Sequence, residues 1–206
     1  MKRYRTVALV SREPGLRVLT EVLLTHPRLD MVSVFTHRNL TRREGGGERP
    51  DYPAFENACT RRDVPLIALE TSDGRESLVR HLPPDPIDLL FVLSWRLIVP
   101  PTVLDRLRCG GINIHRGALP AYAGGYPVQR AIEAGERRVA ITAIDLAEGL
   151  DTGDHLAVAW LDIPPKPRGQ TAEAYAEIVK QQLYPFYAPL ARLAIDLRIA
   201  ATETGE

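Results

Sequence analysis

The segment DPIDLLFVL, residues 85–93, is the clearest candidate for a buried strand in this chain. Pro83 and Pro84 precede it, and the polar turn Ser94-Trp95-Arg96 follows it. A short, continuous apolar run between turn signals is typical of a strand that is buried on both faces of a parallel sheet. We therefore expect a central strand here, with the turn at its carboxyl end.

Other segments on either side repeat this pattern. Short apolar strands are predicted at residues 6–11, 29–35, 65–69 and 110–115. Segments with helical spacing lie between them, at residues 14–25, 52–62, 74–82, 100–107 and 126–134. This alternation predicts an α/β fold: a Rossmann-like, open, mostly parallel sheet with helices on both faces.

The last third of the chain departs from this alternation. Two further strands are predicted at residues 139–144 and 155–163, and the loop between them is too short to hold a crossover helix. They should therefore pair antiparallel and make the sheet a mixed one. A long helix is predicted from about Thr171 to Ile199.

Composition limits the class of protein. The 206 residues fit one domain, and 26 basic residues balance 26 acidic ones, so no overall charge favours nucleic acid. Two cysteines fifty residues apart imply neither a disulfide framework nor a zinc site. No apolar stretch is long enough to cross a membrane. We expect a soluble, cytoplasmic protein with no membrane partner.

The segment His37 to Pro50, HRNLTRREGGGERP, has the character of a mobile, solvated loop. It contains three consecutive glycines and few apolar residues. Its arginines are the one basic cluster that could favour an RNA partner, although a solvated loop explains them as well.

Asn113 and His115 form the first candidate site. They are two apart on a predicted strand, so their side chains leave the same face. An amide and a protonated imidazole are hydrogen-bond donors that suit an oxyanion formed when a carbonyl is attacked. A nearby Asp would keep the imidazole protonated or accept a proton. The Asn-x-His pair alone is weak evidence, because a histidine at a strand end is usually an ordinary hydrogen-bonded residue.

Asp151 lies in the loop between the last two predicted strands, and Asp154 and His155 follow it closely. Together they raise the alternative of a metal-dependent hydrolase. Their spacing matches no dense ligand motif, however, and Asp and Gly are ordinary residues of turns. We therefore expect no metal.

The run GGINIHRGALPAYAGGYPVQRAIEAGE (110–136), followed by ITAIDLAEGLDTGDHL (141–156), resembles the formyltransferases that use 10-formyltetrahydrofolate. That family shows Asn-x-His, then Leu-Pro, a Gly-rich turn, a helix ending in Gly-Glu, and Leu-Asp-x-Gly. All of these elements occur here in this order, and the similarity is clear from about Asp85 to Leu161. The resemblance implies a single N-formyltransferase catalytic domain over residues 1–206.

The resemblance also implies roles for individual residues. Asn113 and His115 would stabilise the tetrahedral intermediate as an amine attacks the formyl carbon, and Asp151 would pair with His115 and assist proton transfer. The cosubstrate 10-formyltetrahydrofolate would be held largely through backbone hydrogen bonds by two segments. Their residues are Arg96, Leu97 and Ile98 in one, and Leu146, Glu148 and Leu150 in the other.

One segment departs from the family pattern. The family follows its histidine with Pro-Ser-Leu-Leu-Pro, whereas this chain has Arg116-Gly117-Ala118-Leu119-Pro120. A serine that helps to hold an acceptor or a water is thus replaced by Gly117. The identity of the acceptor is the property that this change puts in question.

The acceptor is expected to be a primary amine on a small metabolite, with a nucleotide-linked amino sugar as the leading candidate. The turn at residues 11–15, SREPG, is a poor phosphate cradle, which disfavours glycinamide ribonucleotide. The chain ends in a helix rather than the β-barrel of the tRNA enzymes, and its neutral charge suits a tRNA backbone poorly. Both of these acceptors remain alternatives, as does a non-catalytic folate-binding relative. A homodimer through the last helix is left open.

Overall fold

A computed structural model describes residues 2–73 and 75–205, and the chain divides into two compact units, Met1–Ile112 and Asn113–Glu206. Strand β5 (Gly111–His115) carries the chain from the first unit into the second. The prediction that residues 1–206 make one catalytic domain therefore stays a prediction.

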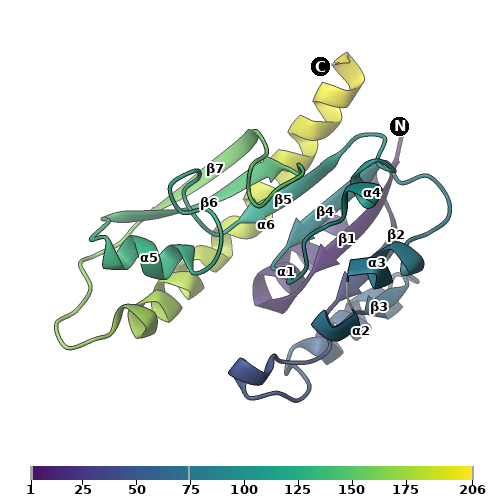
Figure 1. The fold of residues 1–206 in the computed structure, drawn as a ribbon. Coiled ribbons are helices and arrows are strands. Elements are labelled where there is room, and N and C mark those ends of the chain that lie inside the picture. Colours follow the sequence, from purple (N-terminus) through teal and green to yellow (C-terminus); the bar gives the residue numbers. More distant parts are fainter. Residues whose placement is uncertain (1, 74, 206) are drawn as a thin grey trace. The chain divides into compact units, whose positions relative to one another are not determined.

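The first unit is built on four parallel strands in the order β3-β2-β1-β4 (Figure 1). Their bounds are Tyr4–Val10 for β1, Leu29–Thr36 for β2, Leu66–Ala68 for β3 and Leu89–Leu93 for β4. All five residues of β4 are buried, which confirms the buried strand predicted around residues 85–93. The strand starts later than predicted because Pro86 has no N–H, and because the Asp88 carboxylate accepts the Arg5 N–H at 2.8 Å.

The helices of this unit are α1 (Arg12–Val18), α2 (Tyr52–Thr60), α3 (Arg75–His81) and α4 (Pro101–Leu104). The helical segment predicted over residues 14–25 is confirmed over most of its length, but its second half is not α-helical. The chain leaves α1 directly into a π-helical turn, Leu19–Leu23, closed by the Leu24 N–H donating to the Leu19 carbonyl at 3.0 Å. Short 3₁₀ turns occur at Arg42–Glu44 and Thr71–Asp73.

The segment from His37 to Pro50 is more ordered than its composition predicts. Asn39 and Glu48 form an isolated β-bridge, and Thr41 and Glu44 make a capping box around the 3₁₀ turn. Arg49 is 1% exposed and donates to both carboxylate oxygens of Asp51, at 2.8 and 2.9 Å. The expectation that the arginines of this loop are all solvated is therefore wrong for Arg49, because its guanidinium is paired and buried.

The second unit contains α5 (Pro127–Glu133), β6 (Arg138–Asp145), β7 (His155–Asp162) and α6 (Ala172–Thr204) (Figure 1). Strands β6 and β7 pair antiparallel, as the short loop between them predicted. With the parallel strands of the first unit, this pairing confirms an α/β protein whose strands are mostly parallel and partly antiparallel.

Helix α6 is the longest element, and it packs against α5, β6 and β7. The Thr171 hydroxyl caps its first turn by accepting the Ala174 N–H at 3.1 Å. The helix runs five residues beyond the predicted end at Ile199 and stops where Gly205 takes a left-handed conformation. Its exposed large hydrophobic side chains are Ile178, Leu193 and Leu197.

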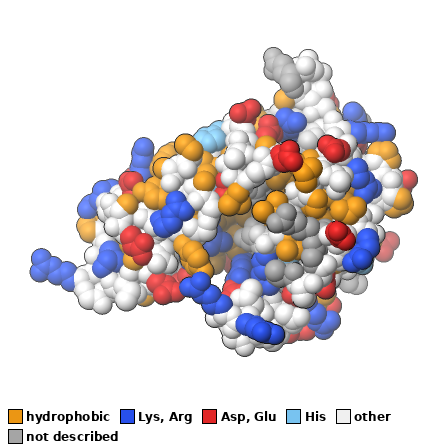
Figure 2. All heavy atoms as spheres, viewed as in Figure 1, with side chains coloured by type: hydrophobic (Ala, Val, Ile, Leu, Met, Phe, Trp, Pro, Cys, Tyr) orange, Lys and Arg blue, Asp and Glu red, His pale blue; other side chains and the backbone are white. Residues whose placement is uncertain are grey.

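Charged side chains of both signs are interspersed on the face that Figure 2 shows, in keeping with the formal net charge of zero. Within residues 2–73 and 75–205, no helix combines the length and the apolar character needed to cross a membrane.

Candidate active site

Asn113, His115 and Asp151 lie together in the second unit. Asn113 and His115 stand two residues apart on β5, and Asp151 lies in the loop that joins β6 to β7. The Asp151 carboxylate reaches both: one oxygen is 3.0 Å from His115 Nδ1, and the other is 3.2 Å from Asn113 Nδ2. The sequence-based expectation that the two side chains leave one face of the strand agrees with this shared partner.

Asp151 has a strained backbone conformation, and its carboxylate faces three hydrogen-bond donors. Its φ of +55° is in the left-handed region, which Asp tolerates better than most residues. A third hydrogen bond comes from the Gly124 N–H at 2.9 Å. Burial alone would raise the pKa of Asp151, but the hydrogen bonds from His115, Gly124 and Asn113 outweigh burial and leave that pKa below its usual value. Asp151 is therefore a carboxylate at neutral pH.

His115 is 9% exposed and has an acceptor at each ring nitrogen. Nδ1 faces the Asp151 carboxylate, and Nε2 lies 2.8 Å from the Tyr122 carbonyl oxygen. A neutral imidazole carries only one N–H, so it could donate only one of these two hydrogen bonds. The doubly protonated imidazolium satisfies both. The geometry thus favours a positive charge on His115 beside the negative charge of Asp151.

Asn113 has one side-chain N–H that the hydrogen bond to Asp151 does not use. Its amide nitrogen carries two N–H groups, and the hydrogen bond to Asp151 uses one of them. Its side chain is partly buried. Of the two donors predicted for an oxyanion, the second N–H of Asn113 has no protein acceptor within the described part of the chain, whereas the His115 Nε2–H is already donated to Tyr122.

Two backbone groups in this cluster carried no signal in the sequence. The Tyr122 carbonyl and the Gly124 N–H belong to a turn of irregular structure before α5. Backbone groups are the same in every residue, so residue identity does not reveal them. The one available hint was the pair Gly124-Gly125, because Gly124 adopts a φ of +80° that glycine reaches without strain.

Gly117, the position where the family has serine, lies in close contact with this cluster. A Cβ atom on Gly117 would lie 2.7 Å from His115 Nε2, 2.7 Å from the Pro127 Cβ and 2.9 Å from the Tyr122 carbonyl oxygen. These separations are shorter than van der Waals contact, and the Gly117 carbonyl also accepts from the buried Thr142 hydroxyl at 2.7 Å. The glycine therefore allows this segment to pass directly over the histidine ring.

We predict that Gly117→Ala lowers kcat at least tenfold and destabilises the fold by about 1–3 kcal/mol, the range for overpacked sites. The added methyl must push either His115 or the turn at Tyr122 out of place. Thermal unfolding and turnover would be compared with Gly169→Ala, where a Cβ meets nothing within 4 Å and the only added strain comes from a φ of +80°. Turnover of Gly117→Ala equal to that of the control would show that the turn yields without moving His115.

Residues 5–187 match the family model described as formyl transferase. The chain belongs to the formyl transferase family. The expected membership of the chain in the formyltransferase family is thus confirmed.

The formyl transferase chain has curated relatives that are longer than it is. It is 30% identical over 145 residues to a methionyl-tRNA formyltransferase of Hydrogenovibrio crunogenus, covering 69% of this chain and 45% of the relative. It is 35% identical over 136 residues to the methionyl-tRNA formyltransferase of Pseudomonas fluorescens, covering 66% and 42%. The chain thus spans less than half the length of these relatives.

Solved structures share its fold. Glycinamide ribonucleotide transformylase 1 from Geobacillus kaustophilus superposes with a TM-score of 0.71 at 19% identity, covering 96% of this chain and 98% of the other. A formyltetrahydrofolate deformylase from Pseudomonas syringae superposes with a TM-score of 0.67 at 19% identity. The superposition covers 98% of this chain and 62% of the deformylase chain. At such identities the likeness establishes the fold alone, and the predicted Rossmann-like formyltransferase fold is confirmed.

The residues predicted to hold folate fall in both units of this formyl transferase. Arg96, Leu97 and Ile98 follow β4 in the first unit, and Ile98 is 47% exposed. The second set follows β6 in the second unit: Leu146, Glu148 and Leu150. Leu150 is 59% exposed and so is available to a ligand. The folate contacts of both sets stay predictions.

The turn at Arg96 rests on a buried histidine that the sequence did not single out. His37 donates from Nδ1 to the Leu69 carbonyl and accepts the Arg96 N–H at Nε2, 3.2 Å away. Its ring stacks on Trp95 with centroids 4.2 Å apart. Burial lowers the pKa of His37 to about 4, so the ring is neutral at physiological pH. Arg96 itself donates to the Asn39 carbonyl at 2.8 Å, which fixes its side chain.

The alternative metal site finds no geometric support in the described residues. No three His, Cys, Asp or Glu side chains among residues 2–73 and 75–205 are placed to share an ion. His155 is exposed at the start of β7, and Asp154 uses its carbonyl to accept the Asp145 N–H at 2.8 Å.

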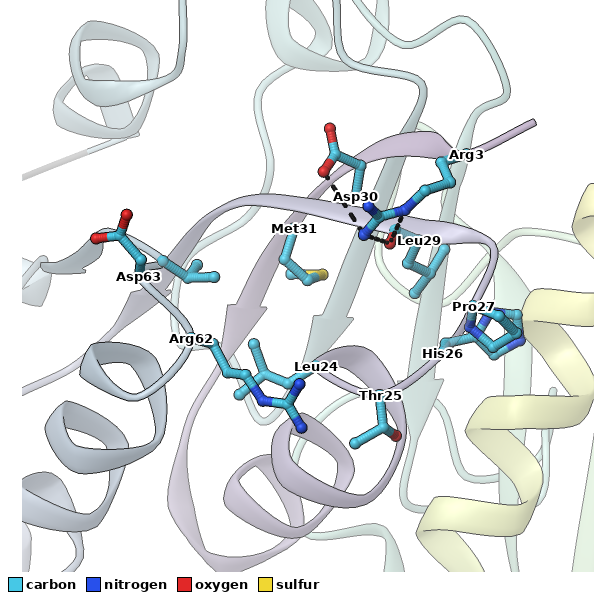
Figure 3. Close-up of a pocket in the computed structure, with 11 residues that line it drawn as sticks. Arg3, Leu24, Thr25, His26, Pro27, Leu29, Asp30, Met31, Arg62 and Asp63 are labelled. Carbon is cyan, nitrogen blue, oxygen red and sulfur yellow. Dashed lines mark hydrogen bonds and ion pairs between the residues drawn. The ribbon is translucent and has the colours of Figure 1, made fainter. Parts of the chain in front are cut away.

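A hollow of about 680 Å³ lies elsewhere in the first unit (Figure 3). Its walls come from residues 24–27 and 29–31, before and within β2, and from residues 62–64, before β3. Arg3, which also lines it, donates to the Leu29 carbonyl at 2.7 Å. It lies at the amino ends of these strands, whereas ligands of open α/β sheets bind at the carboxyl ends. It is therefore not a candidate for the transfer chemistry.

Proposed function

We propose that this chain transfers the formyl group of 10-formyltetrahydrofolate to a primary amine. The observation that carries the proposal is the hydrogen-bonded group of Asn113, His115 and Asp151, in which one carboxylate holds both an amide donor and a histidine with acceptors at both ring nitrogens. The family membership supports the same donor.

Each residue of the group has a distinct role in this proposal. As the amine attacks the formyl carbon, the carbonyl oxygen gains negative charge, and the second N–H of Asn113 donates to it. The imidazolium of His115 lowers the energy of that charge while its Nε2–H stays on the Tyr122 carbonyl. The carbon then loses its bond to the donor nitrogen, which takes up a proton.

Asp151 acts in this scheme first as an anion that holds the imidazolium. Its lowered pKa makes it a weaker base than a free carboxylate. The proton that the attacking amine must lose passes through water to Asp151, and from there to the donor nitrogen as the carbon–nitrogen bond breaks.

The test of the proposal is Asn113→Ala. We expect kcat to fall about 10²- to 10³-fold, which corresponds to the 2.7–4 kcal/mol typical for loss of one oxyanion donor. Formyl transfer would be measured with 10-formyltetrahydrofolate at saturation. Asn57→Ala, an exposed position on α2, is the matched control. Equal turnover in the two variants would remove Asn113 from the chemistry.

The acceptor that we propose is a small metabolite, and a nucleotide-linked amino sugar is the first candidate. The neutral charge balance supports a small acceptor over a polyanion. The turn after β1 also lacks the glycine-rich sequence that would cradle a ribonucleotide phosphate, since it reads Ser11-Arg12-Glu13. A panel of nucleotide-linked amino sugars, glycinamide ribonucleotide and methionyl-tRNA, each assayed for kcat/KM, would identify the acceptor.

Methionyl-tRNA is the second candidate, because the curated relatives at 30–35% identity are methionyl-tRNA formyltransferases by name. An enzyme that grips a tRNA backbone loses affinity steeply as salt rises. A small-molecule acceptor predicts a shallow dependence of KM on salt. Tight folate binding without turnover on any of these amines would instead favour a non-catalytic folate-binding protein.

A further inference from the structure

Arg130 of α5 lies against the turn that contacts the catalytic pair. One terminal nitrogen of its guanidinium donates to the Ala123 carbonyl at 2.7 Å and to the Gly125 carbonyl at 3.3 Å. The other donates to the Ala121 carbonyl at 3.2 Å. One side chain therefore holds three carbonyls of the five-residue segment Ala121–Gly125, which we call the 121–125 turn.

The residues between those three carbonyls are the ones that face the site. Tyr122 places its carbonyl oxygen 2.8 Å from His115 Nε2, and Gly124 places its N–H 2.9 Å from an Asp151 oxygen. The 121–125 turn thus presents alternate backbone groups to Arg130 and to the His115–Asp151 pair. A shift of the turn would change both hydrogen bonds at once.

Contacts of the Tyr122 side chain also hold the 121–125 turn. The Tyr122 hydroxyl donates to the Glu136 carboxylate at 2.7 Å, and the Arg130 guanidinium carbon lies 5.6 Å from the centre of the Tyr122 ring. A cation at this distance over an aromatic face is attracted to it. Arg130 and Glu136 therefore clamp Tyr122 by its face and its hydroxyl.

We propose that Arg130 is a positioning residue that holds the 121–125 turn so that the Tyr122 carbonyl keeps His115 doubly protonated. The inference rests on the proposed function for its kinetic consequence. The planar guanidinium has five N–H groups in a fixed fork and stays charged, so it can span several carbonyls. A lysine at this position could reach about one of them, because its ammonium is a point charge on a flexible stem.

The first test is kinetic, with Arg130→Met and Arg130→Lys. We expect kcat to fall about 10- to 100-fold in the Met variant and at least fivefold in the Lys variant, while the donor KM stays within twofold. A helix-stabilising role alone would be restored by lysine, which keeps the charge near the carboxyl end of α5. Arg138→Met is the matched control, because Arg138 stacks on the exposed Trp160 and contacts no part of the 121–125 turn within the described residues.

The second test needs no substrate. In ¹⁵N NMR of the histidine rings, wild type should show both ring protons of His115, assigned with His115→Gln. Arg130→Met and Arg130→Lys should lose the protected Nε2 proton, and Arg138→Met should keep it. Full kcat in the Lys variant, or a protected Nε2 proton in both Arg130 variants, would overturn the inference. A wild type that transfers no formyl group would defeat the proposed function but leave the NMR result meaningful.

Discussion

Asp151→Asn is expected to lower kcat about 10²- to 10⁴-fold, the range for loss of a group that governs proton transfer or histidine charge. The carboxylate oxygens face three donors: His115 Nδ1, the Gly124 N–H and the Asn113 amide. An Asn side chain offers one oxygen and one NH₂ in place of two oxygens. Its NH₂ would oppose a donor and favour a neutral histidine that lacks the Nδ1 proton.

Asp154→Asn is the control for this prediction, since Asp154 is exposed in the same loop. Turnover at saturating donor and thermal unfolding would be measured for both variants. Loss of a buried acceptor costs about 1–3 kcal/mol of stability, which leaves most of the molecules folded. If Asp151→Asn kept its rate within a few-fold of wild type, the assignment of Asp151 to histidine pairing and proton transfer would be wrong.

Gly153→Ala should unfold the β6–β7 loop locally and lower the free energy of unfolding by about 3–5 kcal/mol, a loss that follows only from a specific disruption. A Cβ on Gly153 would lie 2.7 Å from the Asp145 carbonyl carbon and closer still to its oxygen. Both are backbone atoms, so no side-chain rotation relieves the overlap. The loop is closed at this point by the Asp145 N–H donating to the Asp154 carbonyl at 2.8 Å.

The same substitution should reduce kcat at least as much as Asp151→Asn, because Asp151 stands two residues before the disrupted position. Denaturant unfolding would be compared with Gly135→Ala. Gly135 has a φ of +78° and nothing within 4 Å of its Cβ position, so alanine there adds only the backbone strain of about 1–2 kcal/mol. Equal losses in the two variants would mean that the loop opens without cost and that Asp151 is positioned by other contacts.

Much of the fold could be predicted because its signals are local. The all-apolar run of β4 indicated a strand buried on both faces, and the short loop between β6 and β7 left no room for a crossover helix. The extent of elements was harder to predict. Ser11 and Arg12 begin α1 before Pro14, and the π-helical turn Leu19–Leu23 has the same apolar spacing as an α-helix.

Buried charge could not be predicted from the residue pattern. Arg49 follows three glycines in a polar segment, which is the composition of a solvated loop. Its burial depends on Asp51, which pairs with it, and on the His37 carbonyl, which accepts from it at 2.7 Å. Such pairing depends on the path of the chain around the end of a sheet, and that path cannot be predicted from the residue pattern.

For the site, the sequence by itself determined which side chains we propose for the chemistry. Residues two apart on a strand leave one face by geometry alone, so the spacing of Asn113 and His115 is enough to pair them. Only the tertiary structure decided the hydrogen-bond partners and the position of that pair. The Tyr122 carbonyl, the Gly124 N–H and the fork of Arg130 act through backbone groups, which every residue possesses. The need for glycine at position 117 likewise depends on the tertiary structure, because the turn that folds over His115 leaves no space there for a Cβ atom.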